Sequence, residues 1–195
     1  MRKVIGIISI FLVFAACKDE AKPKPKGFLA LEFPDAMYHR VDLGCAFTFE
    51  VNDISSIKSY GEDQCRFNIE YPKMGGTIYL TYEKIDGNLK ELLEDAQKLP
   101  LKHTIKADEI FGDEYSSESD KAYGMLYTVT GDAASQSQFF LTDSIDHFIT
   151  GSVYFNRAPN YDSIYPAAEY LKTDMKKMME SIRWENEADN DFTVN

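Results

Sequence analysis

Residues 65–82 read CRFNIEYPKMGGTIYLTY, two strand-like runs on either side of a turn. In CRFNIEY and TIYLTY, aromatic or branched residues fall at every second position, which is the period of a half-buried strand. Pro72 to Gly76 supplies residues that favour a turn. The pattern predicts a β-hairpin, the most secure pairing in the chain.

Similar runs lie on both sides of this hairpin. The same alternation predicts strands at Phe28–Phe33, Cys45–Val51, Lys121–Thr130, Ser135–Thr142 and His147–Asn156, with a short strand between His103 and Phe111. The last three long runs are typical of an antiparallel meander. Residues 112–120, GDEYSSESD, lie between the short strand and the run that begins at Lys121. This stretch is polar and acidic and is expected to be a loop.

A helical period replaces the alternation at Asn88. Leu89, Leu92, Leu93, Ala96 and Leu99 fall on one helix face. Asn88 is expected to cap this helix, with Glu91 completing a capping box, and Pro100 is expected to end it.

A second helix is predicted from Asp162 to Arg183. Its apolar stripe includes Met175, Met178 and Met179, which are expected to be core residues. Pro166 is expected in the first turn, where its missing amide costs least, and Trp184 is expected to close the last turn.

The order of these elements predicts one α+β domain at residues 28–184, a largely antiparallel sheet with two packed helices. The acidic end, residues 185–195, is expected to be disordered. One domain also fits the chain length of 195 residues.

The beginning of the chain, MRKVIGIISIFLVFAAC, has the features of a bacterial lipoprotein signal. Arg2 and Lys3 precede an apolar run that is too short to span a bilayer, and two alanines stand before Cys17. We expect residues 1–16 to be removed and Cys17 to carry fatty acyl chains such as palmitate, which would hold the protein on a membrane.

The segment after Cys17 is predicted to be a tether. Residues 17–27 contain KPKPK, whose alternating prolines favour an extended spacer. Removal of the leader would change the net charge from −11 to −13, because Arg2 and Lys3 are lost. So acidic a chain argues against nucleic acid as a partner and suits basic protein surfaces.

Cys45 and Cys65 would lie in an exported protein, where a disulfide is permitted. Each opens an apparent strand, and a simple antiparallel hairpin would place the two strand starts roughly 20 Å apart. They can bond only if the two strands are not hairpin partners. The alternative is two buried thiols.

No sequence motif identifies an enzyme or a metal site. Ser135 or Ser137 with His147 and Asp143 or Asp146 would be the nearest approach to a catalytic triad, but no nucleophile elbow is present. His39, His103 and His147 lack zinc-site spacing, and the acidic residues Asp108, Glu109, Asp113, Glu114, Glu118 and Asp120 lack EF-hand spacing. We expect no catalytic residues, no metal and no cofactor.

A polar and aromatic loop precedes the second helix. Arg157, Asn160, Tyr161 and Tyr165 could form an interaction surface, since tyrosine and arginine often dominate interfaces. Polar loop residues beside an aromatic core are the alternative.

Several long segments together carry a family resemblance: KPKPKGFLALEFP, NIEYPKMGGTIYLTY, NLKELLEDAQKLP, GDAASQSQFFLTDS and NYDSIYPAAEYLKTDMKKMMESIRW. They resemble the GldD gliding-motility lipoproteins over nearly the whole mature chain. More remotely, the order of elements resembles the PsbP and Mog1 type of sandwich, a likeness that carries no function.

The resemblance implies a cell-envelope lipoprotein that is required for gliding and is associated with the type IX secretion apparatus. Lys18-Asp19-Glu20, directly after Cys17, resembles a signal that some bacteria use to send lipoproteins to the outer membrane, so we expect the lipid anchor there. Two hypotheses follow. The first is a non-enzymatic assembly or stabilising factor that binds other gliding and secretion proteins. The second is an envelope ligand-binding module or hydrolase-like enzyme, in which Ser135, Ser137 or His147 would be essential. Cys17 is the only functional position that the resemblance transfers.

Overall fold

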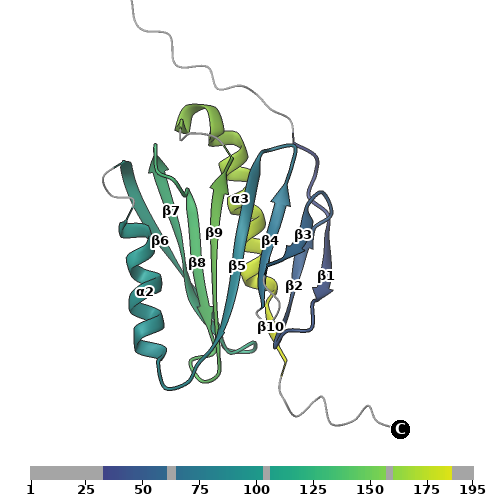
Figure 1. The fold of residues 1–195 in the computed structure, drawn as a ribbon, viewed down its shortest axis with the longest axis vertical. Coiled ribbons are helices and arrows are strands. Elements are labelled where there is room, and N and C mark those ends of the chain that lie inside the picture. Colours follow the sequence, from purple (N-terminus) through teal and green to yellow (C-terminus); the bar gives the residue numbers. More distant parts are fainter. Residues whose placement is uncertain (1–32, 61–64, 103–105, 157–159, 186–195) are drawn as a thin grey trace, which may run out of the picture.

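The computed structural model describes residues 33–60, 65–102, 106–156 and 160–185. Figure 1 shows strands and two helices in one body. Their bounds are β1 Tyr38–Asp42, β2 Phe47–Asn52, β3 Ser56–Ser59, β4 Arg66–Tyr71, β5 Gly76–Lys84, α2 Leu89–Leu101, β6 Ala107–Ser117, β7 Ala122–Gly131, β8 Ser137–Thr142, β9 His147–Phe155, α3 Tyr161–Ser181 and β10 Arg183–Trp184. The α+β class predicted from the sequence is confirmed.

The predicted hairpin and meander are both present. β4 and β5 pair antiparallel with Ile69 opposite Ile78, and β7, β8 and β9 pair antiparallel in chain order. β9 also pairs with β5, so the meander joins the hairpin directly. The two segments that were most strongly patterned in the sequence therefore form the middle of one sheet.

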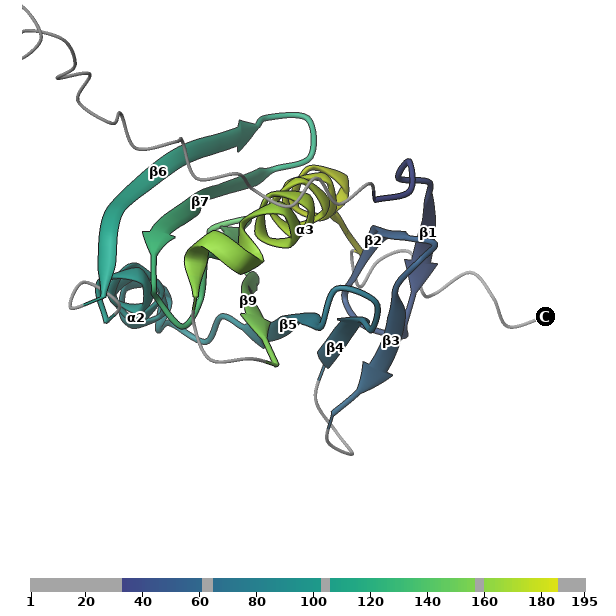
Figure 2. The same ribbon diagram turned by 90° about the horizontal axis from the view of Figure 1, so that it is seen from above.

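That sheet has seven strands in the order β3-β4-β5-β9-β8-β7-β6. A smaller sheet has the order β1-β2-β10. Figure 2, seen from above, shows the large sheet curving around α3, with β1 and β2 on the far side of the helix from α2. The short strands β1 and β3 were not predicted from the sequence.

The main core lies between the large sheet, α3 and β2. It contains alternate residues of β2, β4, β5, β8 and β9, together with the apolar stripe of α3. The fully buried members with the largest side chains are Tyr71, Phe47, Phe49, Ile69, Ile78, Leu80, Leu141, Ile149, Leu171, Met175 and Met178. The expectation that the methionines are core residues is confirmed.

A smaller core lies on the opposite face of the large sheet, beneath α2. Phe140 and Phe148 stack with ring centroids 5.9 Å apart, and Ala96 of α2 packs against them. Leu92 and Leu93 are only partly buried. Phe139 and Leu141 belong to the other core, so β8 alternates between the two faces.

The prediction of a loop at residues 112–120 is wrong for most of its length. β6 runs through it to Ser117 and pairs with β7 along the hairpin. Only Tyr115 turns toward the main core, while Asp113 and Glu114 are exposed. An edge strand tolerates this polarity because its hydrogen bonds to β7, and not its burial, hold it in place.

Several predicted helix ends are also wrong. Asn88 makes no capping bond to α2 and instead accepts a hydrogen bond from the backbone N–H of Asp86, so there is no capping box. Pro100 lies inside α2, which continues to Leu101. Pro166 is in the second turn of α3, which starts at Tyr161.

The end of α3 differs from the prediction as well. The helix stops at Ser181, and Trp184 belongs to β10, where it pairs with Phe47 of β2. Its indole N–H donates to the carbonyl oxygen of Lys121. Strand pairing thus replaces the last predicted turn, because β2 would otherwise have an open edge.

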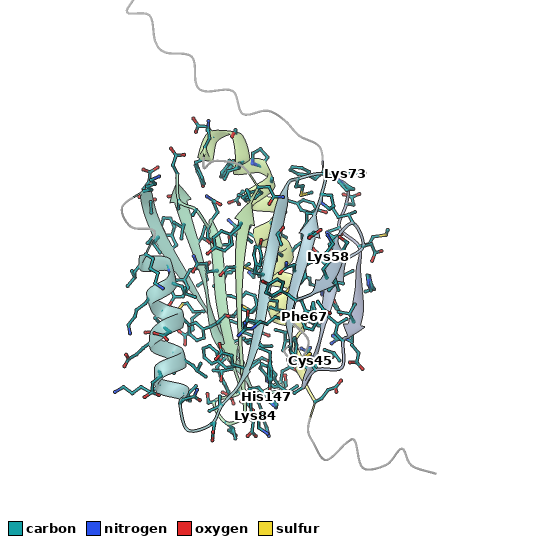
Figure 3. The ribbon with its side chains drawn as sticks, viewed as in Figure 1. Cys45, Lys58, Phe67, Lys73, Lys84 and His147 are labelled. Atoms are coloured by element: carbon teal, nitrogen blue, oxygen red, sulfur yellow. A yellow bond between two sulfur atoms is a disulfide. The ribbon has the colours of Figure 1, made fainter. Side chains whose placement is uncertain are left out.

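The two described cysteines form a disulfide between the sheets. Cys45 and Cys65 have Cα atoms 6.0 Å apart. Cys45 precedes β2 of the small sheet and Cys65 precedes β4 of the large one, so the two strands are not hairpin partners. Figure 3 labels Cys45 near the lower end of the molecule. The bond closes the main core at that end.

Some predictions fall on residues outside the described ranges. These are the leader at 1–16, Cys17, the tether at 17–27, most of the run Phe28–Phe33, His103, Arg157 and the tail after residue 185. Phe33 itself is described and does not belong to a strand.

Candidate functional site

The predicted interaction surface is partly assembled at the start of α3. Tyr161 donates its backbone N–H to Asp132 Oδ1 at 2.8 Å, and its ring meets that of Tyr165 at 5.5 Å. Asn160 and Tyr161 border an open pocket of about 260 Å³, which Lys106 also lines. Arg157 is outside the described residues.

The pKa of Tyr161 is raised, first by burial and then by nearby negative charges that include Glu169 and Asp108. Asp108 and Asp132 both line the same pocket. This end of the molecule is therefore a polar, partly acidic hollow with aromatic rings beside it.

The hypothetical triad is not brought together. Ser135 and Ser137 are fully buried, and the hydroxyl of Ser135 donates to the carbonyl oxygen of Ser137. Gln138, next to Ser137, pairs with Ser152, which is five residues along β9 from His147. At about 3.4 Å per residue, that separation is roughly 17 Å.

His147 instead has structural partners. Its Nδ1 lies 2.9 Å from the hydroxyl of Tyr82, and its ring stacks on Trp184 with centroids 5.1 Å apart. Figure 3 places His147 beside Lys84 at one end of the large sheet, opposite the end that carries Lys73. Asp143 accepts hydrogen bonds from three backbone N–H groups in the turn before β9.

The candidate metal ligands are also dispersed. In the described part of the chain, no group of three or more histidine, cysteine or acidic residues is placed to hold a metal ion. His39 pairs with Asp53 at 2.6 Å, and Asp120 pairs with Arg183 at 3.1 Å. Most of the acidic run lies along β6.

A buried polar cluster that the sequence analysis missed joins α3 to the small sheet. Asp174 of α3 is only 3% exposed. Its carboxylate accepts a hydrogen bond from the Tyr38 hydroxyl at 2.5 Å and another from Asn52 Nδ2 at 2.8 Å. We call Tyr38, Asn52, Tyr170 and Asp174 the Asp174 cluster. No described lysine or arginine forms an ion pair with its carboxylate.

The Asp174 cluster also holds the beginning of the described chain. The Tyr170 hydroxyl donates to the carbonyl oxygen of Pro34 at 3.1 Å and accepts from Asn52 Nδ2 at 3.0 Å. The rings of Phe33 and Tyr170 lie 5.2 Å apart. Phe33 and Pro34, at the beginning of the described chain, therefore lie against α3.

Tyrosine hydroxyls around Asp174 are kept protonated. The pKa of Tyr38 is raised, first by burial and then by its hydrogen bond to Asp174. The pKa of Tyr71 is raised by burial and by the nearby charge of Asp174. The Tyr71 hydroxyl is buried and makes no hydrogen bond with a described residue. The cluster is thus a set of neutral donors around one buried carboxylate.

A signal for this cluster was available in the sequence. Asp174 stands three residues after Leu171 and four before Met178, so it lies on the apolar stripe of the helix. A carboxylate in that position must be paired or hydrogen-bonded when the stripe is buried. Its partners, Tyr38 and Asn52, come from strands more than a hundred residues away and could not be identified by spacing.

The fold defines a class: one small α+β domain in which α3 packs between a seven-stranded sheet and a three-stranded one. None of the described helices is both long and apolar enough to cross a membrane. The model of the gliding motility lipoprotein GldD family matches residues 18–184, and the chain belongs to that family. The resemblance seen in the sequence is confirmed. No curated protein sequence matches the chain.

Family membership places the chain among membrane-anchored lipoproteins of the cell envelope that serve gliding motility. The match begins one residue after Cys17 and ends at Trp184. It therefore covers the predicted tether after Cys17 and the predicted α+β domain at residues 28–184.

Proposed function

We propose that this lipoprotein is a non-enzymatic component that binds and stabilises other envelope proteins of the gliding and type IX secretion machinery. We further propose that acyl chains on Cys17 hold it at the outer membrane. The observation that carries the proposal is the family match over residues 18–184. Two features of the structure support it.

The first supporting feature is the attachment of the N-terminal segment. Tyr170 of α3 donates a hydrogen bond to Pro34 and its ring contacts Phe33, while Asp174 of the same helix accepts hydrogen bonds from the small sheet. The beginning of the described chain is therefore coupled through α3 to β1 and β2. Such coupling suits a scaffold, whose partners must meet at a fixed place.

The second supporting feature is the environment of the residues named by the enzymatic hypothesis. Ser135 and Ser137 are buried in β-sheet surroundings, and His147 is engaged by Tyr82 and Trp184. These residues have packing roles in the described structure. The hypothesis of a hydrolase gains no support from their arrangement.

A deletion strain tests the proposed function. We expect loss of gliding together with depletion or mislocalisation of at least one gliding or secretion protein of the envelope, measured by quantitative proteomics of membrane fractions. A Cys17→Ala variant should be released from the membrane and should fail to restore gliding. Normal levels and positions of all these proteins in the deletion strain would refute the role.

Substitution of Ser135, Ser137 and His147 distinguishes the proposed non-enzymatic role from the enzymatic hypothesis. Ser135→Ala, Ser137→Ala and His147→Gln variants that reach normal abundance should support gliding, because their side chains make structural contacts only. Loss of gliding at normal abundance in these variants would favour the enzymatic hypothesis. Density-gradient separation of the two membranes tests the outer-membrane assignment.

A further inference from the structure

β6 forms one edge of the seven-stranded sheet. It pairs with β7 on one side, and no described strand pairs with its other side. Figure 2 shows β6 as the outermost labelled strand on its side of the sheet, next to β7. At 11 residues it is long for an edge, since proteins usually keep edge strands short to avoid unwanted pairing.

The register shows which peptide groups of β6 face outward. Val129 of β7 donates its backbone N–H to Gln136, so alternate residues of β7 face β8 and those between them, including Thr128 and Leu126, face β6. Phe111 and Asp113 are the partners of these two residues. Gly112, Glu114 and Ser116 therefore turn their backbone N–H and C=O groups away from the sheet.

This edge is strongly acidic. Asp108, Glu109, Asp113 and Glu114 are all exposed, and none of them forms an ion pair with a described residue. Phe111 is 50% exposed and adds an apolar contact in the same stretch. Backbone groups, negative charge and one aromatic ring are thus presented together along an extended line.

We propose that β6 binds an extended, basic segment of another envelope protein, which adds to the large sheet as a further strand. The proposal rests on the proposed function, since it names the surface and the partner chemistry through which the lipoprotein would bind. Main-chain hydrogen bonds to an edge strand supply affinity in this mode of recognition, and side-chain complementarity supplies specificity. Lysine or arginine side chains would meet the unpaired carboxylates.

Neither a second copy of this protein nor its own tether is well suited to pair with the β6 edge. A second copy pairing through β6 would bring two acidic edges together, and like charges that face each other across strands are destabilising. The basic tether at Lys22–Lys26 has proline at every second position, so it lacks the N–H groups that a strand must donate. A basic segment of a different protein could hydrogen-bond to the outward peptide groups of β6 and pair with its carboxylates.

Peptide binding to the full mature chain, purified in detergent, tests the proposal. The probe is a short peptide that alternates lysine with valine, and its affinity is measured by calorimetry at low and high salt. We expect binding that weakens as salt screens the charges. A matched peptide in which every backbone amide is N-methylated should lose at least about tenfold in affinity, since neither of its edges can donate to the ladder. Equal binding of the two peptides, or none by either, would overturn strand addition.

Protein variants separate the contribution of the acidic side chains to binding from that of the backbone hydrogen bonds. Asp113→Lys with Glu114→Lys should weaken binding at least about tenfold, while Glu83→Lys with Asp86→Lys, an equal charge change on the far end of β5 and its loop, should not. Glu114→Pro removes one outward N–H and should weaken binding more than Glu114→Gln does. Circular dichroism checks that each variant is folded. Equal losses in the paired variants would overturn the assignment to β6.

A test in cells distinguishes failure of this inference from failure of the proposed function. If the deletion strain loses an envelope partner but the Asp113→Lys, Glu114→Lys strain keeps it, the β6 assignment is wrong and the assembly role stands. If the deletion strain itself keeps every partner, the proposed function is wrong. Dimerisation of the wild-type chain that Glu114→Pro abolishes would identify a second copy as the occupant and overturn the inference.

Discussion

The two faces of the large sheet differ in how they are closed. The face toward α3 is covered along its length by the helix and the small sheet, and its core includes the fully buried Leu171 and Met175. The face toward α2 has a small core around Phe140 and Phe148. Beyond it, Tyr79 and Tyr154 meet edge to face and remain 43% and 37% exposed.

This difference separates the part of the domain that stabilises the fold from the part that exposes groups for binding. Most apolar burial, the disulfide and the Asp174 cluster lie on the α3 face, so that face should determine whether the domain folds. The α2 face and the β6 edge carry exposed rings and unpaired charges, which contribute little to folding. Regions with few buried contacts are where binding surfaces usually lie.

The largest expected effect compares leucines on the two helices. Leu171→Ala should lower the free energy of unfolding by about 2–5 kcal/mol, because Leu171 is fully buried and its removal leaves a cavity. Leu92→Ala on α2 should cost about 1 kcal/mol, since Leu92 is only partly buried. Urea unfolding of the mature chain measures both. Equal losses would mean that the two faces contribute alike.

The disulfide provides the next test. Replacing Cys45 and Cys65 together with alanine should lower the free energy of unfolding by about 3 kcal/mol, because the bond closes a loop with a sequence separation of 20. Reduction of the wild-type chain with dithiothreitol should reproduce the loss. If neither treatment changes the urea midpoint, the α3 face does not depend on this link between the sheets.

The sequence allowed the central strands and the main helix to be predicted because their periodicities are strong. Residues 65–82, the meander and the apolar stripe of α3 are each patterned over many positions, and each is buried on at least one face. β6 was missed because its outer positions are acidic and only Tyr115 points into the core. An edge strand is held by pairing, which leaves little trace in hydrophobicity.

The candidate sites were less predictable than the fold. Of the proposed interaction surface, Asn160, Tyr161 and Tyr165 do lie together, since they share one helix end. The Asp174 cluster requires Tyr38 and Asn52 to come from the small sheet, and no local rule indicates those contacts. The sequence also did not decide between a Cys45–Cys65 disulfide and two free thiols, because the bond depends on the two strands belonging to different sheets.

Asp174 itself provides a test of intermediate size. Asp174→Asn keeps the shape of the side chain but replaces one acceptor oxygen by an NH₂ group, which then faces a hydrogen-bond donor. The free energy of unfolding should therefore fall by about 2 kcal/mol. In a double-mutant cycle with Tyr38→Phe, the two losses should not add, since both changes act on the hydrogen bond between Tyr38 and residue 174. Strict additivity would show that the Tyr38 contact contributes nothing to the closure of the α3 face.

The smallest expected effect concerns the unpartnered hydroxyl of Tyr71. Tyr71→Phe should raise the free energy of unfolding at neutral pH by about 1 kcal/mol, because it removes a buried polar group that makes no hydrogen bond with a described residue.

The same variant tests the alkaline behaviour of the α3 face. Burial and the charge of Asp174 raise the pKa of Tyr71 in the folded chain, while in the unfolded chain the group ionises near pH 10. Above about pH 10 the unfolded state therefore binds fewer protons, and stability that is complete below that pH is lost at about 1.4 kcal/mol per pH unit for each such tyrosine. Urea unfolding between about pH 8 and about pH 11 should show a shallower decline in Tyr71→Phe than in the wild-type chain, with Tyr38 accounting for a remaining part. An unchanged decline would mean that Tyr71 ionises in the folded protein as readily as in the unfolded chain, and that the α3 face is less tightly closed than its buried side chains indicate.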